Sequence, residues 1–343
     1  MLTAVLTAPG VIALIEEPVP AAGANELLLR VESVGLCGSD LTAFKGKHPL
    51  RRPPVVLGHE ASGVVAGVGS AVTGFAVGDR VAVCPQVSCG TCDACSRGLE
   101  NVCTQRKAPG IGSWPGFLSE TIAVPAATAV RLDASIPADM GCLTETLAVA
   151  VHAVERARLL PSASAAVIGG GTVGVLCAVV ACRRGASVAL VIDPKSTNRS
   201  IAESFAGVRA CRSDLKAIRE ATTELTRDKG FDVVLVASGH PSSLDEAHRL
   251  VCRGGRIVVA ALYGAAVTFD PLPLVAKEVD IAGTATYTQA DFSEAAAMLA
   301  EHWAALRRVI THHGRLSDVQ RYLDDMGRID FPGMKIVIEP QHG

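Results

Sequence analysis

The sequence contains few aromatic residues and almost no net charge. Phenylalanine, tryptophan and tyrosine together make up 4% of the 343 residues, so the core must consist mainly of alanine, valine, leucine and isoleucine. The formal net charge is −2, which provides no electrostatic attraction for nucleic acid or for an acidic membrane surface. The composition therefore predicts a protein with no nucleic-acid or membrane partner.

The chain also lacks a hydrophobic run that suits a membrane span. The longest stretch without a charged residue, Leu159–Cys182, is long enough to cross a bilayer, but Pro161 and the glycines at 169–171 and 174 interrupt it. This stretch fits a buried strand, a tight turn and a helix better. Residues 1–20 lack the basic start of a signal peptide, and we expect a cytoplasmic protein.

The first third of the chain predicts a β-rich domain. The total length favours about two domains. Glycine, proline and short β-branched runs are frequent in this first part, as is typical of short antiparallel strands joined by turns. The expected strands are Glu26–Val34, Gly63–Val68, Asp79–Val83 and Glu120–Val124.

The pattern changes near Thr144, where an amphipathic helix is expected over Leu143–Leu159. Short apolar runs then alternate with helical segments, which predicts βαβ units and a parallel sheet. A helix at Phe292–Arg308 and a strand at Met334–Glu339 follow, and this strand is expected to join the sheet of the first domain. The expected parallel strands are Ala165–Ile168, Val188–Ile192, Val233–Val236 and Ile257–Leu262.

Four of the eleven cysteines have the spacing of a metal site. They follow the pattern C-x2-C-x2-C-x7-C, and four thiols this close cannot all form unstrained disulfides. Four thiolates can surround one tetrahedral zinc ion, which would brace the loop and do no chemistry, although an iron–sulfur cluster also takes four cysteines. Zinc in a reducing compartment is favoured. The four residues are Cys89, Cys92, Cys95 and Cys103.

A second set of residues suits an open metal site. Cys37 lies in a Gly-Leu-Cys-Gly-Ser-Asp segment, His59 and Glu60 follow Gly58, and Glu145 lies at the start of the expected linking helix. One thiolate, one imidazole and one or two carboxylates suit zinc with a position left for water or substrate. Each fragment is weak evidence alone, since a single cysteine is usually a packing residue.

A glycine-rich loop predicts a dinucleotide site. Gly169-Gly170-Gly171-Thr172-Val173-Gly174 matches G-x-G-x-x-G between an expected strand and an expected helix. The glycines let the backbone approach a pyrophosphate at the helix N-terminus. Asp193 ends the next strand, where a carboxylate bonds ribose hydroxyls and repels a 2′-phosphate, which favours NAD over NADP. Lys195 and Arg199 weaken this preference, because basic side chains could accommodate that phosphate.

Taken together, these motifs resemble the zinc-dependent medium-chain alcohol dehydrogenases over nearly the whole chain. The branch that it resembles most is that of the sorbitol and threonine dehydrogenases, where the polyol enzymes have Glu-Pro-Leu at the position of Glu145-Thr146-Leu147. The cysteine cluster matches the structural-zinc lobe of the family. The other matching segments are Gly58-His59-Glu60-x-x-Gly63, Gly69, Gly78-Asp79-Arg80-Val81, Arg253-Gly254-Gly255-Arg256 and Lys277-Glu278.

The resemblance implies two domains and two zinc ions. Residues 1–146 and 286–343 would form a GroES-like catalytic domain, with the structural zinc lobe at about 84–105, and residues 147–285 a Rossmann domain. Catalytic zinc would be bound by Cys37, His59 and Glu60, with Glu145 as fourth ligand or as a neighbour across a water. Which of the two glutamates binds directly stays open. Ser39 matches the hydroxyl that contacts the substrate oxygen.

The chain departs from this family at the proton relay. Relatives often carry a histidine five residues after the zinc cysteine, and this chain has Thr42, which can pass a proton but cannot hold it near neutral pH. His48 could substitute for it from nearby, but an ordinary loop histidine beside Pro49 is the favoured interpretation. Asp40 is expected to orient the metal site through a basic partner, for which Lys335 is the candidate. His152 is expected on a helix face and not as a ligand.

The resemblance implies oxidation of a secondary alcohol by transfer of hydride to NAD. A glutamate-rich zinc site and few aromatic residues favour a polar, polyhydroxylated substrate, such as a polyol, cyclitol, sugar or aminosugar, with the ketone as product. Three alternatives stay open: a threonine-type hydroxy-amino-acid dehydrogenase, a zinc-independent reductase of the same superfamily, and a catalytically silent NAD- and zinc-binding protein. Relatives form dimers or tetramers, so a homo-oligomer is expected.

Overall fold

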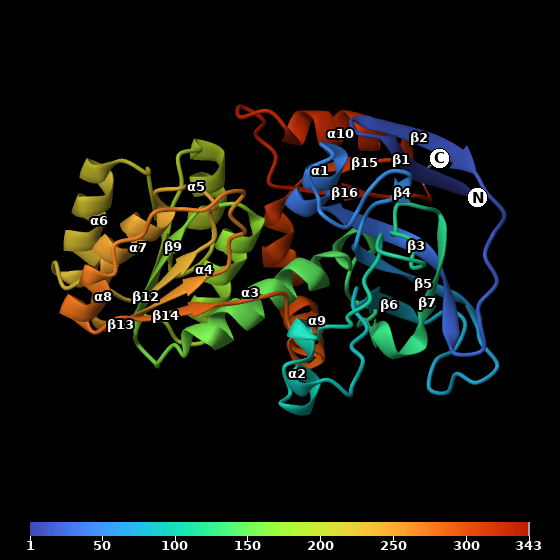
Figure 1. Ribbon diagram of the computed structural model, residues 1–343, viewed down its shortest axis with the longest axis horizontal. Helices are drawn as coiled ribbons and strands as arrows, with labels where there is room; N and C mark the ends of the chain where they lie inside the picture. Colours follow the sequence, from blue (N-terminus) through green and yellow to red (C-terminus); the bar gives the residue numbers. More distant parts are fainter. Residues whose placement is uncertain (342–343) are drawn as a thin grey trace. The chain divides into compact units, whose positions relative to one another are not determined.

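The computed structural model describes residues 1–341, which divide into two compact units (Figure 1). The first unit comprises Met1–Thr146 and the segment from Thr288 onward, and the second comprises Leu147–Tyr287. Each unit has its own sheet and its own hydrophobic core. The first unit is therefore built from two separate stretches of the chain.

A large sheet forms the centre of the first unit. Leu27, Leu29 and Val31 on its longest strand are fully buried at every second position, which is the pattern of a strand with one face in the core. All pairs in the sheet are antiparallel except β15 with β16. The strands, in spatial order, are β15 (Ile310–Gly314), β16 (Lys335–Ile338), β3 (Glu26–Leu36), β5 (Glu60–Val68), β6 (Arg80–Val83) and β8 (Ala129–Arg131), with β7 (Thr121–Pro125) also on β3.

The expected strands of this unit are present, and the final strand joins its sheet. β16 pairs antiparallel with β3, where Ile336 lies opposite Leu36. A second, smaller antiparallel sheet packs in the same unit, and the sequence analysis did not predict it. Its strands, in spatial order, are β2 (Val11–Glu16), β1 (Leu2–Ala8) and β4 (Val55–Val56).

The second unit contains a parallel sheet of six strands among the described residues. The strands occur in the order third, second, first, fourth, fifth and sixth of the unit, which is the order of a Rossmann fold. The strands that follow β9 in the sequence are therefore added first on one side of it (β10, β11) and then on the other (β12, β13, β14). In spatial order the strands are β11 (Val208–Cys211), β10 (Val188–Ile192), β9 (Ser164–Ile168), β12 (Phe231–Val236), β13 (Val251–Val259) and β14 (Asp280–Gly283).

One expected strand of this unit is displaced along the chain. The sequence predicted a strand over Ile257–Leu262, whereas β13 begins at Val251 and ends at Val259. The prediction was wrong at its end because Leu262 is 91% exposed and lies in a loop, so its apolar character does not mark a buried strand. The strands β11 and β14 were not predicted.

The helices follow the strands as the alternating pattern requires. The linking helix α3 (Leu143–Ala157) ends where Arg158 adopts a left-handed conformation with φ 51°, so it is shorter than the expected 143–159. No helix in the described part of the chain is both long and apolar enough to span a membrane. The other helices are α1 (Gly38–Phe44), α2 (Asp93–Ser96), α4 (Thr172–Arg183), α5 (Ser196–Glu203), α6 (Leu215–Thr226), α7 (Ser243–Leu250), α8 (Leu272–Lys277), α9 (Gln289–Leu306) and α10 (Val319–Met326).

The glycine loop between β9 and α4 is a point of close backbone contact. Gly169 has φ 97°, a conformation that favours glycine, and its carbonyl oxygen lies against Gly174 in the first turn of α4. A Cβ atom at position 174 would collide with that oxygen, whereas one at Gly171 would meet no atom within 4 Å. The packing of the helix on the strand therefore requires glycine at position 174.

We expect the substitution Gly174→Ala to destabilise the second unit, because backbone cannot move aside for the added methyl group. An overpacked site of this kind typically costs about 1–3 kcal/mol. Thermal unfolding followed by circular dichroism should show a lower midpoint for Gly174→Ala and little change for Gly171→Ala. Equal midpoints for the two variants would contradict the close contact.

Candidate functional site

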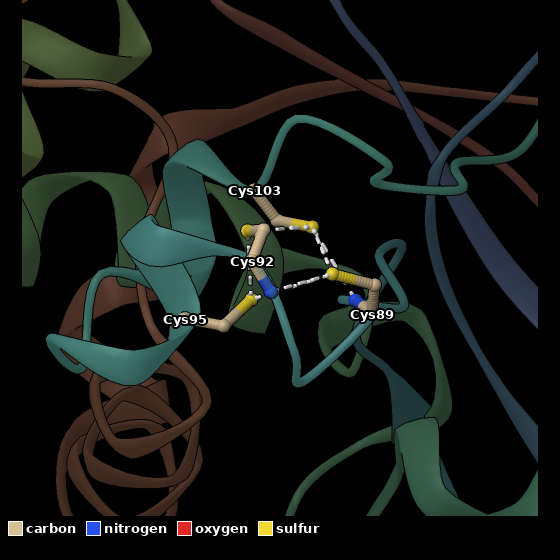
Figure 2. Close-up of side chains that lie close together, drawn as sticks. All are labelled: Cys89, Cys92, Cys95 and Cys103. Carbon is tan, nitrogen blue, oxygen red and sulfur yellow. Dashed lines mark hydrogen bonds between the residues drawn. The ribbon is translucent and has the colours of Figure 1, made fainter.

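The four clustered cysteines come together in one loop region of the first unit. Figure 2 shows their side chains pointing toward a common centre. The sulfur atoms of Cys92 and Cys95 are 3.5 Å apart, as are those of Cys89 and Cys103, and all four lie within 4.8 Å of one another. None of them forms a disulfide. The arrangement can hold one metal ion with four sulfur ligands.

Local structure explains how the loop gathers these thiols. The short helix α2 begins after Cys92 and contains Cys95, so the two side chains lie one helical turn apart on the same side. Gly90 and Gly98, each with φ 72°, turn the chain on either side of it. Main-chain N–H groups donate to the sulfur atoms of Cys89 and Cys103 over 3.4 and 3.3 Å. Such donors stabilise thiolates, the form that binds metal.

A second group of possible ligands lies where β3 and β5 meet. Cys37 follows the end of β3, His59 immediately precedes β5, and Glu60 is the first residue of β5. The strand β5 pairs with β3 so that Gly35 lies opposite Glu60. A sulfur, an imidazole nitrogen and a carboxylate oxygen of these three residues lie within 4.8 Å of one another. His59 is 9% exposed and Glu60 is 1% exposed. The register of two strands therefore brings together residues that are far apart in the sequence.

Asp40 is the partner of His59. Its Oδ1 lies 3.4 Å from Nδ1 of His59, within ion-pair distance, and it also accepts hydrogen bonds from the main-chain N–H groups of Cys37 and Gly58. Burial opposes the charge on Asp40, but the neighbouring His59 outweighs it and holds the pKa of Asp40 at about 2. Burial likewise lowers the pKa of His59, and Asp40 raises it well above its ordinary value. This carboxylate therefore fixes the orientation of the imidazole ring.

Lys335 contacts Glu60 and not Asp40. Its Nζ donates to both oxygens of Glu60 over 2.6 and 2.8 Å, and also to the Leu36 carbonyl over 3.4 Å. The expectation that Lys335 pairs with Asp40 was therefore wrong, because β16 enters the sheet beside the end of β3 and places this lysine against the start of β5. Burial lowers the pKa of Lys335, but the charge of Glu60 raises it above its ordinary value.

The structure places Glu145 outside the group that Cys37, His59 and Glu60 form. Among the described residues, its oxygens are not part of the set within 4.8 Å. Glu145 lies in the first turn of α3, is 8% exposed and is close to Cys84. Burial, together with the charge of Glu145, raises the pKa of Cys84 to about 12. The sequence analysis did not identify Cys84 as a neighbour of this glutamate.

The hydroxyl groups near Cys37 have defined partners. The Oγ of Ser39 accepts a hydrogen bond of 3.2 Å from Arg51, a contact that no sequence motif indicated. Thr42 donates its hydroxyl to the Gly38 carbonyl within α1 over 2.9 Å. Thr42 is therefore bonded to its own helix.

The ring of His48 is tied to the main chain. Its Nδ1 accepts hydrogen bonds from the N–H groups of Leu50 and Arg51, and burial followed by the charge of Arg51 lowers its pKa. The neutral ring then carries its hydrogen on Nε2. His152 is buried on α3 and is not part of either ligand group in the described chain.

The glycine loop of the second unit is tied to the end of the next strand. The carboxylate of Asp193 accepts hydrogen bonds from the main-chain N–H groups of Gly170 and Lys195 over 2.7 and 2.8 Å, and from the Asn198 amide over 3.1 Å. Arg199 donates to the carbonyl oxygens of Asp193 and Pro194. Asn198 was not predicted. Asp193 thus lies beside the glycine loop. Thr172 and Val173 are the first two residues of α4, which follows that loop.

We expect loss of one metal ion per chain when Cys103 is replaced with serine, because three thiols no longer close the first site. Elemental analysis should show this loss, and thermal unfolding of the first unit should begin at a lower temperature. Cys182→Ser, which changes a cysteine of α4 in the second unit, is the matched control and should keep the metal content. Equal metal content in the two variants would refute a metal site at the four cysteines.

We expect Lys335→Met to destabilise the first unit, because it leaves the buried Glu60 carboxylate without its counter-charge. Breaking a buried pair from one side typically costs about 3–5 kcal/mol. Lys335→Arg should retain much of the stability. Lys216→Met, which removes the exposed pair with Glu220, should change little. Denaturant unfolding measures all three variants, and a small loss for Lys335→Met would show that the pair does not hold the strand.

Comparison with known proteins agrees with this architecture. The model of the alcohol dehydrogenase GroES-like domain matches residues 23–134, and that of zinc-binding dehydrogenases matches residues 172–301. The chain is 35% identical to 2-dehydro-3-deoxy-L-galactonate 5-dehydrogenase of Pseudoalteromonas atlantica, over 92% of each chain. It is 30% identical to D-xylulose reductase A of Aspergillus niger, over 91% of this chain and 89% of that one.

A solved structure shows the same fold over the whole chain. Galactitol-1-phosphate dehydrogenase from Escherichia coli is 25% identical, covers 99% of this chain and 100% of its own, and superposes with a TM-score of 0.90. The GroES-like and Rossmann folds expected from the sequence are thereby confirmed. The chain belongs to the zinc-dependent medium-chain alcohol dehydrogenase family, whose members are oxidoreductases that act on CH–OH groups.

Proposed function

We propose that this enzyme oxidises a secondary alcohol of a polar, polyhydroxylated compound to the ketone, with NAD as hydride acceptor and zinc at the group formed by Cys37, His59 and Glu60. The observation that carries the proposal is this group of three different ligand types, of which His59 and Glu60 are buried and Cys37 is half-buried. A thiolate, an imidazole and a carboxylate with an open fourth position suit catalytic zinc. Zinc bound there supplies Lewis-acid polarisation of an alcohol oxygen.

The residues around this group support its use as a ligand set. Because Asp40 faces Nδ1 of His59, the second ring nitrogen, Nε2, is the one that can bind a metal. Lys335 balances the charge of Glu60. We assign the third ligand position to Glu60, because its oxygen lies within the group, and propose that Glu145 acts from a neighbouring position through a water molecule.

Ser39 is the proposed proton acceptor. The bond from Arg51 uses one lone pair of its Oγ, so the hydroxyl hydrogen and a second lone pair can serve the substrate. Thr42 uses its hydroxyl hydrogen within its own helix, so it has no hydrogen to pass onward in this conformation. His48 has Nδ1 occupied by two main-chain N–H groups, so its neutral ring offers no free acceptor. We therefore propose that Ser39 accepts the proton of the alcohol as it releases its own hydroxyl hydrogen, for which a ribose hydroxyl of a bound cofactor would be the acceptor.

The glycine loop is the proposed binding site for the dinucleotide. Gly169, Gly171 and Gly174 let the pyrophosphate approach the start of α4. Asp193, at the end of β10, suits the ribose hydroxyls and repels a 2′-phosphate, which favours NAD. Arg199 donates to the carbonyl oxygens of Asp193 and Pro194, which supports a role in fixing the turn after β10 and not in binding a phosphate.

The named relatives support the class of substrate. The three relatives described above are a 2-dehydro-3-deoxy-L-galactonate 5-dehydrogenase, a D-xylulose reductase and a galactitol-1-phosphate dehydrogenase, and each of these named compounds carries several hydroxyl groups. We further propose that the enzyme works in the cytoplasm as a homodimer or homotetramer with two zinc ions per chain. The eleven cysteines, none of them in a disulfide, agree with a reducing compartment.

We expect zinc-loaded protein to form NADH from NAD with at least one member of a panel of polyols, cyclitols, aminosugars and sugar acids. Absorbance of NADH measures the rate, and NADP is tested with each compound that reacts. A hit on L-threonine alone would favour the alternative of a hydroxy-amino-acid dehydrogenase. Zinc and NAD binding without turnover on any compound would favour a catalytically silent protein.

We expect His59→Ala and Cys37→Ser to abolish turnover and to lose one zinc ion, while NAD binding, measured by fluorescence titration, persists. Cys252→Ser is the control, since that cysteine lies in the second unit and belongs to neither ligand group. Full activity in a protein freed of zinc would overturn the proposed mechanism.

A further inference from the structure

Arg51 is a buried cation beside the proposed catalytic hydroxyl. It lies in the loop between α1 and β4, and its side chain is largely covered, with 8% of the residue exposed. Its Nη1 donates to Ser39 Oγ and its Nε donates to the Pro109 carbonyl, each over 3.2 Å. The guanidinium is thus fixed next to the residue that would meet the reacting oxygen.

In the part of the chain that the structure describes, no carboxylate lies within ion-pair distance of this cation, although its charge helps to lower the pKa of the nearby Asp40. Its two hydrogen-bond acceptors are a hydroxyl and a main-chain carbonyl, both uncharged. A guanidinium has five N–H donors, so three of them are not used by these contacts. Arginine is almost never fully buried unless it is paired, because loss of hydration costs free energy that an opposite charge recovers. The three unused N–H donors therefore suit an anion that approaches more closely than Asp40 does.

The surroundings of Arg51 are shaped to hold the side chain in place. Gly110 lies against it with φ 73°, and a Cβ atom there would lie 3.3 Å from both Arg51 Nε and the Val56 carbonyl oxygen. The main-chain N–H of Arg51 donates to His48 Nδ1 over 2.9 Å, which fixes the turn that carries it. A glycine, a carbonyl and a ring nitrogen thus fix the arginine at a single position.

We propose that Arg51 binds an anionic group, a carboxylate or a phosphate, on the same carbon chain as the reacting alcohol. The proposal rests on the function proposed above, because Ser39 defines where the reacting oxygen lies. The planar fork of a guanidinium matches the paired oxygens of both anions. The substrates are then sugar acids or sugar phosphates in preference to neutral polyols, and Arg51 is the residue that determines this preference.

The test compares substrates that differ only in the group at one end of the chain. Galactonate, galactitol 1-phosphate and galactitol form one such set, and the gluco, manno and ido compounds form three more. For wild-type enzyme, kcat/KM should be at least about tenfold higher for one anionic class than for its neutral partner. The better of the two anions shows whether the site takes a carboxylate or a phosphate.

The variant Arg51→Met should lower that ratio by about 10- to 100-fold, mainly through KM for the anionic substrate. Arg51→Lys keeps the charge without the fork and should retain part of the preference. Arg52→Met is the matched control, because the adjacent Arg52 is exposed and its Nε donates to the Pro49 carbonyl in the same loop. Unfolding midpoints establish that each variant is folded.

Three results would overturn the proposal while leaving the dehydrogenase function intact. Wild-type enzyme could use neutral polyols as well as their anionic partners. The ratio of kcat/KM between anionic and neutral substrates could stay unchanged in both Arg51 variants while all substrates react equally more slowly. Arg51 would then only position Ser39. Weaker binding of NAD with an unchanged ratio would assign Arg51 to a cofactor phosphate. Absence of turnover with every compound would instead overturn the proposed function itself.

Discussion

The first unit depends on the burial of charge where β3, β5 and β16 meet. Glu60 is almost completely buried, and a carboxylate in that position is stable only with an opposite charge and hydrogen bonds beside it. Lys335 provides both from a position 275 residues further along the sequence. The return of the chain to the first sheet after the second unit is thus required by the chemistry of the site, and not only by the need of a strand for neighbours.

The two ligand groups differ in the kinds of ligand that they contain and in how far apart those ligands lie in the sequence. The four cysteines are alike, lie in one short loop and receive main-chain hydrogen bonds, so they can surround an ion on every side. Cys37, His59 and Glu60 are of three kinds and come from the ends of two strands. Two charged partners contact these ligands, Asp40 beside the imidazole of His59 and Lys335 on the carboxylate of Glu60.

The sequence predicted what depends on local spacing and failed where distant segments meet. The run Val188–Ile192 is a strand with those limits, because four buried apolar residues in a row suit a parallel sheet. β1 and β2 were missed, because neither strand alternates: Thr3–Leu6 are buried in a row, whereas β2 is apolar except at Glu16 but is largely exposed. The pairing of Lys335 and the position of Arg51 depend on tertiary contacts. No spacing in the sequence encodes a lysine that reaches Glu60 from the final strand.

Gly35, which lies opposite Glu60 in the sheet, leaves the space in which the Glu60 carboxylate meets Lys335. A methyl group on Gly35 would occupy the space of the Glu60 carboxylate and push it away from Lys335. The addition of one methyl group would then break the ion pair by which β16 contacts the start of β5, although β16 would stay paired with β3. Across homologous sequences, glycine at this position should accompany the lysine in the final strand, so that the two are gained or lost as a pair.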